Sequence, residues 1–348
     1  MAMNNDIIEC CLLPGQKRLP YIFIMDVGES SRGAIELIRD HLPPDLRHLA
    51  VYKRLKNNKE YAINVLECSI GRMEPTPDEV SQIVAFLSTL ITPVEANNQA
   101  EVGLSSFLSM VVQAVFISKM DNDERGNANI YEPHVDRELD GLLKSLNIDA
   151  DSKSYFSLVN ICHERGHYRA RDLAHRYAMP TLHDAIAVVT ADQEIKNRYS
   201  VVESKSGGSM ISMFTRTLTE AISMYECFAH HTQFDVSTAR VVSVDLQDVM
   251  GTNPKQIALF FQAARMYSKK KFAYTEDDIP LFPDNFKEYY RNLVEEIMED
   301  KKIMAFDELH RVKQSPMLFG ELVKDCKEGR KWNLQLLFAS QEITDFGS

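Results

Sequence analysis

Residues 302–341 read KIMAFDELHRVKQSPMLFGELVKDCKEGRKWNLQLLFASQ and carry the most informative pattern in the chain. An apolar run over 303–306 leads into the adjacent acids Asp307 and Glu308. A helical pattern and a second apolar run follow, and the second run leads to Gln341. Short apolar runs that alternate with helices predict buried parallel strands, whose carboxyl ends meet at one edge of a sheet. We therefore expect the two acids and the amide to share that edge.

The acid pair suits the chemistry of a magnesium nucleotide. A carboxylate at a strand end can hold Mg²⁺ through its water shell, and an adjacent glutamate can polarise an attacking water. We assign these roles to Asp307 and Glu308, and we assign Gln341 to sensing the γ-phosphate. The alternative is that the acids only mark where a buried strand meets water. The phosphate-binding pattern GxxxxGK[ST] occurs nowhere in the sequence.

A basic pair, Arg330 and Lys331, lies between the two predicted strands. In ring-shaped ATPases an arginine at such a place can reach the nucleotide of the neighbouring subunit and accelerate its hydrolysis. Basic residues at a helix end also simply complement the helix dipole. Arg311, three residues after Glu308, is the rival for the role of trans arginine.

The composition narrows the class of protein. The chain has 348 residues, 45% of them hydrophobic, and a formal charge of −11 from 39 basic and 50 acidic residues. This balance argues against a dedicated nucleic-acid surface. The six cysteines form no CxxC pattern, which favours reduced thiols in a cytoplasmic protein. No apolar run approaches the roughly 20 residues of a membrane span, and no signal peptide is evident.

Hydrophobic periodicity divides the rest of the chain into three parts. Apolar runs predict strands over 19–25, 49–52, 61–66 and 240–246, the first of which ends at Asp26. A capping box at Thr76 and Glu79 opens a long series of amphipathic helices. We predict an α/β core formed by 1–80 and 236–348, with an all-α insertion over 81–235.

One further motif needs an explanation. His163-Glu164-Arg165-Gly166-His167 matches HExxH, the pattern of zinc hydrolases. Such a site needs both histidines on one face of a stable helix together with a third ligand. The central Arg-Gly weakens a helix, so we favour a solvated surface over a zinc site.

Four blocks of the sequence share the order of motifs found in one family. They are IFIMDVGESSRG (22–33), YAINVLECSIGRMEPTPDEV (61–80), VVSVDLQDV (241–249) and the opening stretch with FDELHRV, GRKWN and LLFASQE. Together they resemble the large cytoplasmic ATPases of type IV secretion and conjugation, the TraC-like family of the FtsK/HerA superclass of P-loop NTPases. In that resemblance FDELHRV corresponds to the Walker B element.

The resemblance implies a RecA-like core with an all-α insertion, which hydrolyses ATP with Mg²⁺. It further implies a homo-hexamer at the cytoplasmic face of the inner membrane, with other secretion-system ATPases and channel components as partners. By position, Asp307 is the Mg²⁺ aspartate, Glu308 the catalytic base, Arg330 the trans arginine and Gln341 the sensor. Asp26 is a further candidate for contact with the bound nucleotide.

The chain departs from the family at its start. The phosphate-binding loop should precede residue 22 by a helix and a strand, but only 21 residues stand there. We therefore expect a core truncated before its first strand and P-loop, cut just after the P-loop helix, and unable to hydrolyse ATP alone. The alternative is a non-catalytic module that docks a partner of the secretion apparatus.

Overall fold

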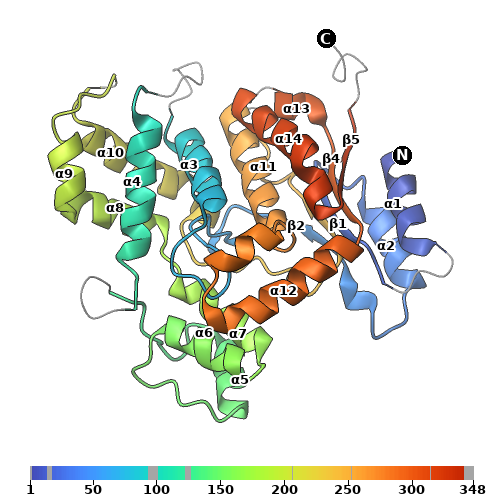
Figure 1. Cartoon of the computed structure of the whole chain (residues 1–348). Coiled ribbons are helices and arrows are strands. Elements are labelled where there is room, and N and C mark those ends of the chain that lie inside the picture. Colours follow the sequence, from blue (N-terminus) through green and yellow to red (C-terminus); the bar gives the residue numbers. More distant parts are fainter. Residues whose placement is uncertain are drawn as a thin grey trace. The chain divides into compact units, whose positions relative to one another are not determined.

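The computed structural model describes residues 2–13, 18–92, 101–121, 127–205, 207–251, 253–313 and 315–340. The chain forms two compact units (Figure 1). The sheet unit comprises Met1–Tyr61, Phe234–Ile279 and Tyr289–Ser348. The helical unit comprises Ala62–Gln233 and Pro280–Glu288. The helical unit thus interrupts the sheet unit along the sequence, as an insertion does.

A five-stranded parallel sheet forms the centre of the sheet unit, with the order β2-β3-β1-β4-β5. The strands are β1 (Tyr21–Asp26), β2 (Ala50–Arg54), β3 (Val241–Asp245), β4 (Lys302–Phe306) and β5 (Leu334–Phe338). Every residue of β1, β3 and β4 is buried. Continuous apolar runs are the signature of strands covered on both faces, and the predicted α/β class is confirmed.

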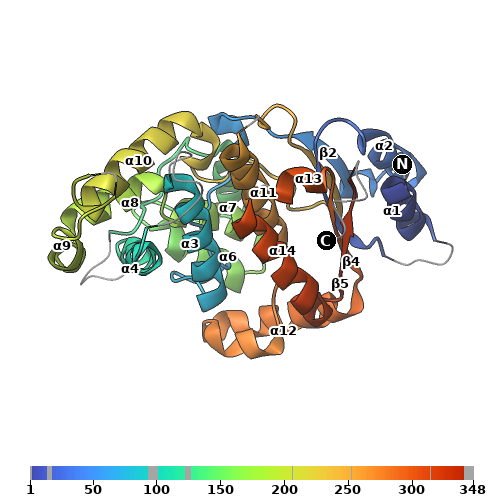
Figure 2. The same ribbon diagram turned by 90° about the horizontal axis from the view of Figure 1, so that it is seen from above.

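Helices cover both faces of this sheet (Figure 2). On one face α1 (Ala2–Leu12) and α2 (Arg32–His41) pack apolar side chains against Ile22 and Ile24. On the other face α11 (Pro254–Lys269) places Phe261 against Phe306. The remaining helices are α12 (Asp284–Glu299), which begins in the helical unit, α13 (Leu309–Lys313), α14 (Pro316–Glu328) and the 3-10 turns η1 (Arg47–Leu49), η2 (Lys59–Tyr61), η5 (Glu276–Leu281) and η6 (Gly329–Trp332).

The helical unit contains α3 (Pro77–Ile91), α4 (Leu104–Ile117), α5 (Arg137–Ser145), α6 (Tyr155–Glu164), α7 (Tyr168–Ala178), α8 (Leu182–Ala191), α9 (Gln193–Tyr199), α10 (Met210–Met224) and the 3-10 turn η4 (Glu226–Phe228). The predicted capping box is present at the start of α3, with Thr76 and Glu79 bonded reciprocally. Among the described helices, none is both long and apolar enough to cross a bilayer.

The prediction of a strand over 61–66 is wrong. The Ile63 N–H donates to the Cys227 carbonyl at 2.8 Å and the Gln233 N–H donates to the Ala62 carbonyl at 2.8 Å, but no ladder follows. Asn64 instead uses its side chain, which accepts from the Leu66 N–H at 3.0 Å. An apolar run without a neighbouring strand therefore forms irregular backbone. Residues 62–80, which we assigned to the core, lie in the helical unit.

Candidate functional site

The carboxyl edge of the sheet gathers charged side chains from neighbouring strands. Arg54 ends β2, Asp245 ends β3, Asp26 ends β1 and Asp307 directly follows β4. The parallel register pairs Asp26 with Asp245, and the Asp307 N–H donates to the Met25 carbonyl at 3.0 Å. Three carboxylates from three adjacent strands therefore lie side by side.

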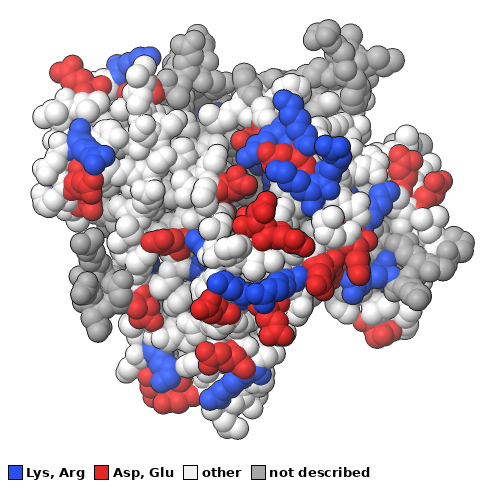
Figure 3. Space-filling model, in the orientation of Figure 1, with Lys and Arg blue, Asp and Glu red and all other residues white. Residues whose placement is uncertain are grey.

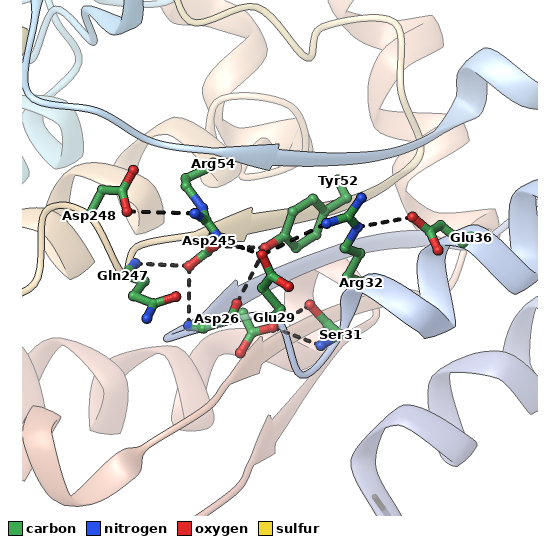
Figure 4. A network of polar contacts seen from close by, with 11 residues as sticks. Asp26, Glu29, Ser31, Arg32, Glu36, Tyr52, Arg54, Asp245, Gln247 and Asp248 are labelled. Atoms are coloured by element: carbon green, nitrogen blue, oxygen red, sulfur yellow. Dashed lines mark hydrogen bonds and ion pairs between the residues drawn. The ribbon is translucent and has the colours of Figure 1, made fainter.

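Asp245 lies at the centre of a fully paired polar network (Figure 4). Its Oδ2 accepts from the Tyr52 hydroxyl at 2.7 Å and from Arg54 Nε at 2.7 Å. Its Oδ1 accepts from the backbone N–H groups of Gly28 at 3.1 Å and Gln247 at 2.8 Å. Burial alone raises the pKa of Asp245, but these four donors outweigh burial and hold the pKa below its usual range.

The turn after β1 is shaped by a glycine. Gly28 has a φ of +119°, a conformation that residues with a side chain rarely adopt. This turn directs the Gly28 N–H at Asp245 and returns the chain to Ser30 and Ser31. Arg54 closes the network from outside, because it also pairs with Glu29 at 2.6 Å.

Asp26 is completely buried and is held by the two serines of this turn. Its Oδ2 accepts from the Ser31 N–H at 2.8 Å and from the Ser31 hydroxyl. The Ser31 hydroxyl also lies 2.6 Å from the Ser243 hydroxyl on β3. The Ser30 hydroxyl lies 2.9 Å from Asp26 Oδ1 and 3.2 Å from Asp307 Oδ2, and so bridges the two carboxyl groups.

Among the described residues, no cation pairs with Asp307 in the way that Arg54 pairs with Asp245. Burial, the hydrogen bond between its carboxyl group and that of Asp26, and the negative charge of Asp26 raise the pKa of Asp307 to about 6. Hydrogen bonds from the Glu308 N–H at 3.0 Å and from Ser30 act in the opposite direction. The geometry gives the pair a direct electrostatic reason to bind a cation.

Glu308 adopts a left-handed backbone conformation with a φ of +59°. A residue with a side chain pays about 1–2 kcal/mol for this conformation, and such outliers are common at functional sites. The Glu308 carboxylate lies 3.3 Å from His310 Nε2 and 3.8 Å from Arg311 Nε. Arg311 thus lies beside the acids of its own chain.

The first turn of α1 lies at the same edge of the sheet. Asn4 donates from Nδ2 to the Ser30 carbonyl at 2.8 Å, which ties this turn to the loop that bridges Asp26 and Asp307. The first turn contains no acidic residue. A helix amino terminus offers unpaired N–H groups and a partial positive charge, both of which favour phosphate. The sequence pattern did not reveal this helix, and we expected the helix of the phosphate loop to lie outside the chain.

Two of the predicted site residues do not join this group. Arg330 is exposed in η6, ahead of β5, and therefore lies at the amino edge of the sheet, about 16 Å of strand away from the acids. Gln341 follows the last described residue and lies outside the described part of the chain. Asp26, Asp307 and Glu308 are brought together, whereas Arg330 is not.

β5 forms an open edge of the sheet. Among the described residues it pairs with β4 only, and none of its five residues is buried. Its sequence, LQLLF, carries neither charge nor proline. Edge strands usually carry charged residues or proline, which prevent further strand pairing. Without them, the free edge of β5 is suited to pairing with a further strand.

The HExxH motif does not form a zinc site. α6 ends at Glu164 and α7 begins at Tyr168, so the two histidines do not share a helix face. The two ring nitrogens of His163 lie 2.9 Å from the Asn285 carbonyl and 3.2 Å from the Arg171 guanidinium. Within the residues that the structure describes, no group of three or more His, Cys, Asp or Glu could hold a metal ion.

Sequence reasoning missed the partners of the acids. Asp245 ends an apolar run in the same manner as Asp26, and this shared pattern was the available signal. Nothing in the sequence indicated Ser30 as a bridge or Arg54 and Tyr52 as donors, because these residues come from other strands and turns.

Comparison with solved structures gives a structural likeness. No protein-family model matches the chain, and no curated protein matches its sequence. A solved structure of VirB4 from Thermoanaerobacter pseudethanolicus superposes with a TM-score of 0.44 at 14% sequence identity. The superposition covers 95% of this chain and 72% of the VirB4 chain.

Proposed function

We propose that this chain belongs to the motor domain of a cytoplasmic ATPase of type IV secretion, and that the carboxyl edge of its sheet holds MgATP. The observation that supports this most directly is the meeting of Asp307, Glu308 and Asp26 with the first turn of α1. Mg²⁺ is usually bound by one or two carboxylates together with phosphate oxygens and water. The carboxyl groups of Asp26 and Asp307 could bind the cation, and the helix amino terminus beside them could bind the phosphate.

Each acid has a distinct role in this proposal. Asp307 orients the water shell of Mg²⁺, and its raised pKa falls when the cation arrives. Glu308 polarises the water that attacks the γ-phosphate. Asp26 stays paired with Ser31 and positions Ser30 beside Asp307. Gln341 and Arg330 keep their predicted roles as γ-phosphate sensor and trans arginine.

The phosphate cradle must come from another segment, because the sequence contains no GxxxxGK[ST]. We propose that it arrives on an additional parallel strand beside β5, followed by a loop that enters α1. The open apolar edge of β5 supports this placement. The addition would complete a RecA-like core around the all-α insertion.

The sequence also suggests which type IV secretion ATPase the chain is related to. The stretch ECSIGRMEPTPDE, residues 67–79, resembles DotO (IcmB) of the Dot/Icm type IVB systems. We infer a homo-hexamer that works at the inner membrane with other secretion-system ATPases and channel components. In that setting hydrolysis would energise assembly of the channel or transfer of its cargo.

Turnover by the intact protein tests the proposal. We expect Glu308→Gln to abolish ATP hydrolysis, by at least about 100-fold, while binding of a fluorescent ATP analogue persists. The matched control is Glu220→Gln, an exposed position on α10, which should hydrolyse at the wild-type rate. The present chain alone should show negligible turnover. A fully active Glu308→Gln protein would overturn the proposal.

A docking module without catalysis is the second candidate. It is favoured by the contacts of the Glu308 carboxylate with His310 and Arg311. These contacts engage the side chain that would have to polarise the attacking water. Secretion by cells that carry Glu308→Gln separates the two functions. Normal secretion supports docking alone, whereas loss of secretion with normal protein levels supports the motor.

A further inference from the structure

α14 and η6 carry an exposed stripe that changes from apolar to basic. It consists of Phe319 and Val323, which are 40% and 37% exposed, followed by the exposed Lys327 and Lys331. Residues four apart lie on one face of a helix, so these side chains line the outer surface of the sheet unit. Arg330 adds a further exposed cation at the basic end.

A second stripe of opposite charge lies on the carboxyl-terminal half of α12. Glu295 and Glu299, four residues apart, are exposed, and Met298 between them is 54% exposed. This half of α12 belongs to the sheet unit, as α14 does.

The two stripes are neighbours. Asn333 follows Lys331 by two residues, and Asp300 directly follows Glu299. The Asn333 Nδ2 donates to the Asp300 carbonyl at 3.1 Å, so the ends of the two stripes lie close together. Figure 3 shows Lys and Arg gathered above a band of Asp and Glu on this face. Within the described residues, none of Lys327, Lys331, Glu295 and Glu299 forms an ion pair. Unpaired charges of opposite sign therefore approach each other where η6 and α12 end.

We propose that this face docks a second copy of the chain about a two-fold axis. Two adjacent patches of opposite charge are self-complementary, because a half-turn places each basic stripe on the partner's acidic stripe. The exposed Phe319, Val323 and Met298 supply apolar contacts at the centre. Nucleic acid would be repelled by α12, and an acidic peptide would gain from only half of the face.

The size and charge of the face set the strength of this contact. A helix of 13 residues is about 20 Å long, so two helices give a face well below the roughly 800 Å² per partner of a standard interface. We therefore expect a weak dimer with a Kd on the order of 10–100 μM. The net charge of −11 opposes association over the rest of the surface, so the dimer depends on the local match. This inference does not depend on the nucleotide site.

Sedimentation velocity of the purified chain tests it. We expect dimers to form as the concentration rises to a few hundred μM in about 50 mM salt, and to dissociate in about 500 mM salt because screening weakens the charge pairs. The double variants Lys327→Glu with Lys331→Glu, and Glu295→Lys with Glu299→Lys, should each weaken self-association at least about 10-fold. Circular dichroism confirms that each variant is folded.

Mixing the two double variants gives the decisive result. In each variant alone the substituted stripe takes the sign of the other stripe, but the mixture is complementary in both stripes and should form a heterodimer as tight as the wild-type dimer. Lys144→Glu with Lys205→Glu is the control, since both lysines are exposed in the helical unit. A monomer at every concentration, a dimer that ignores these charges, or a mixture that stays monomeric would overturn the proposal.

Discussion

Asp245 and Asp307 stand at the same edge of one sheet, separated only by β1, yet they differ in their electrostatics. Asp245 accepts from Tyr52, Arg54 and two backbone N–H groups, and its pKa is lowered. Asp307 faces the carboxyl group of Asp26, and its pKa rises to about 6. Both acids end an apolar run in the sequence, so the difference arises from neighbours rather than from the local pattern.

The Asp245 carboxylate stabilises the fold, whereas the Asp307 carboxylate is suited to binding a ligand. Donors already satisfy Asp245, so a cation would gain little there. Asp307 shares its environment with a second acid, and a cation would relieve their repulsion. Asp26 between them links both centres, because its serine partners reach Ser243 on β3 and Asp307 after β4. The same substitution at the two acids should therefore have opposite effects.

The largest expected effect is loss of stability in Asp245→Asn. The amide would turn a donor towards Tyr52 or Arg54 and leave buried groups unpaired, which lowers the free energy of unfolding by about 2–3 kcal/mol. Urea unfolding near neutral pH measures this. Asp248→Asn is the control, since its carboxylate is 40% exposed and 3.7 Å from Arg54, and should change stability by less than about 0.5 kcal/mol. If both variants lost the same free energy of unfolding, the hydrogen bonds of Asp245 would not stabilise the fold as argued.

The next largest effect is expected at the serines around Asp26. Ser31→Ala removes a buried hydroxyl that contacts Asp26 and Ser243, and should lower the free energy of unfolding by about 1–2 kcal/mol. Ser30 is exposed, so Ser30→Ala should lower it by only about 0.5 kcal/mol. The same unfolding experiment ranks the two. A larger loss for Ser30→Ala would show that the bridge between the acids, not the buried contact, stabilises this turn.

Asp307→Asn should stabilise the protein near neutral pH by about 1 kcal/mol, discounted for partial exposure. The folded pKa of Asp307 is raised to about 6, above the unfolded value of about 3.9. The folded state therefore binds more protons within this window, and stability falls as pH rises through it. The difference between variant and wild type should be near zero at about pH 4 and reach its maximum above about pH 7. A difference that stays constant with pH would contradict the raised pKa.

The smallest effect is expected from Mg²⁺ without nucleotide. At about 10 mM, a cation bound with a Kd of about 10 mM should stabilise the protein by about 0.4 kcal/mol, which raises Tm by about 1 °C. Differential scanning fluorimetry measures the shift against sodium chloride of equal ionic strength. The shift should vanish in Asp307→Asn and persist in Glu220→Gln. A shift that survives in Asp307→Asn would place the cation elsewhere.

Much of the fold followed from the sequence, but less of the site did. The apolar runs at 303–306 and 334–338 became β4 and β5, and the capping box at Thr76 formed as predicted. The run at 61–66 failed because its pattern matched a strand but no strand lay beside it. The sequence could predict that Asp26, Asp307 and Glu308 lie at one edge, because the direction of parallel strands places their carboxyl ends together. Arg54, Ser30 and the first turn of α1 were missed because contacts between distant segments bring them to the edge.

Hydrophobic periodicity indicates which residues end the buried strands, because a buried parallel strand needs a continuous apolar run and its direction fixes which end meets the edge. This rule places Asp26 and Asp307 at one edge, and it holds equally for Asp245. The strand order β2-β3-β1-β4-β5 follows from contacts between distant segments, and this order sets which acid faces a cation and which faces another acid. Electrostatic energy depends on separation in space and on burial, and neither quantity is written in a local pattern of residues.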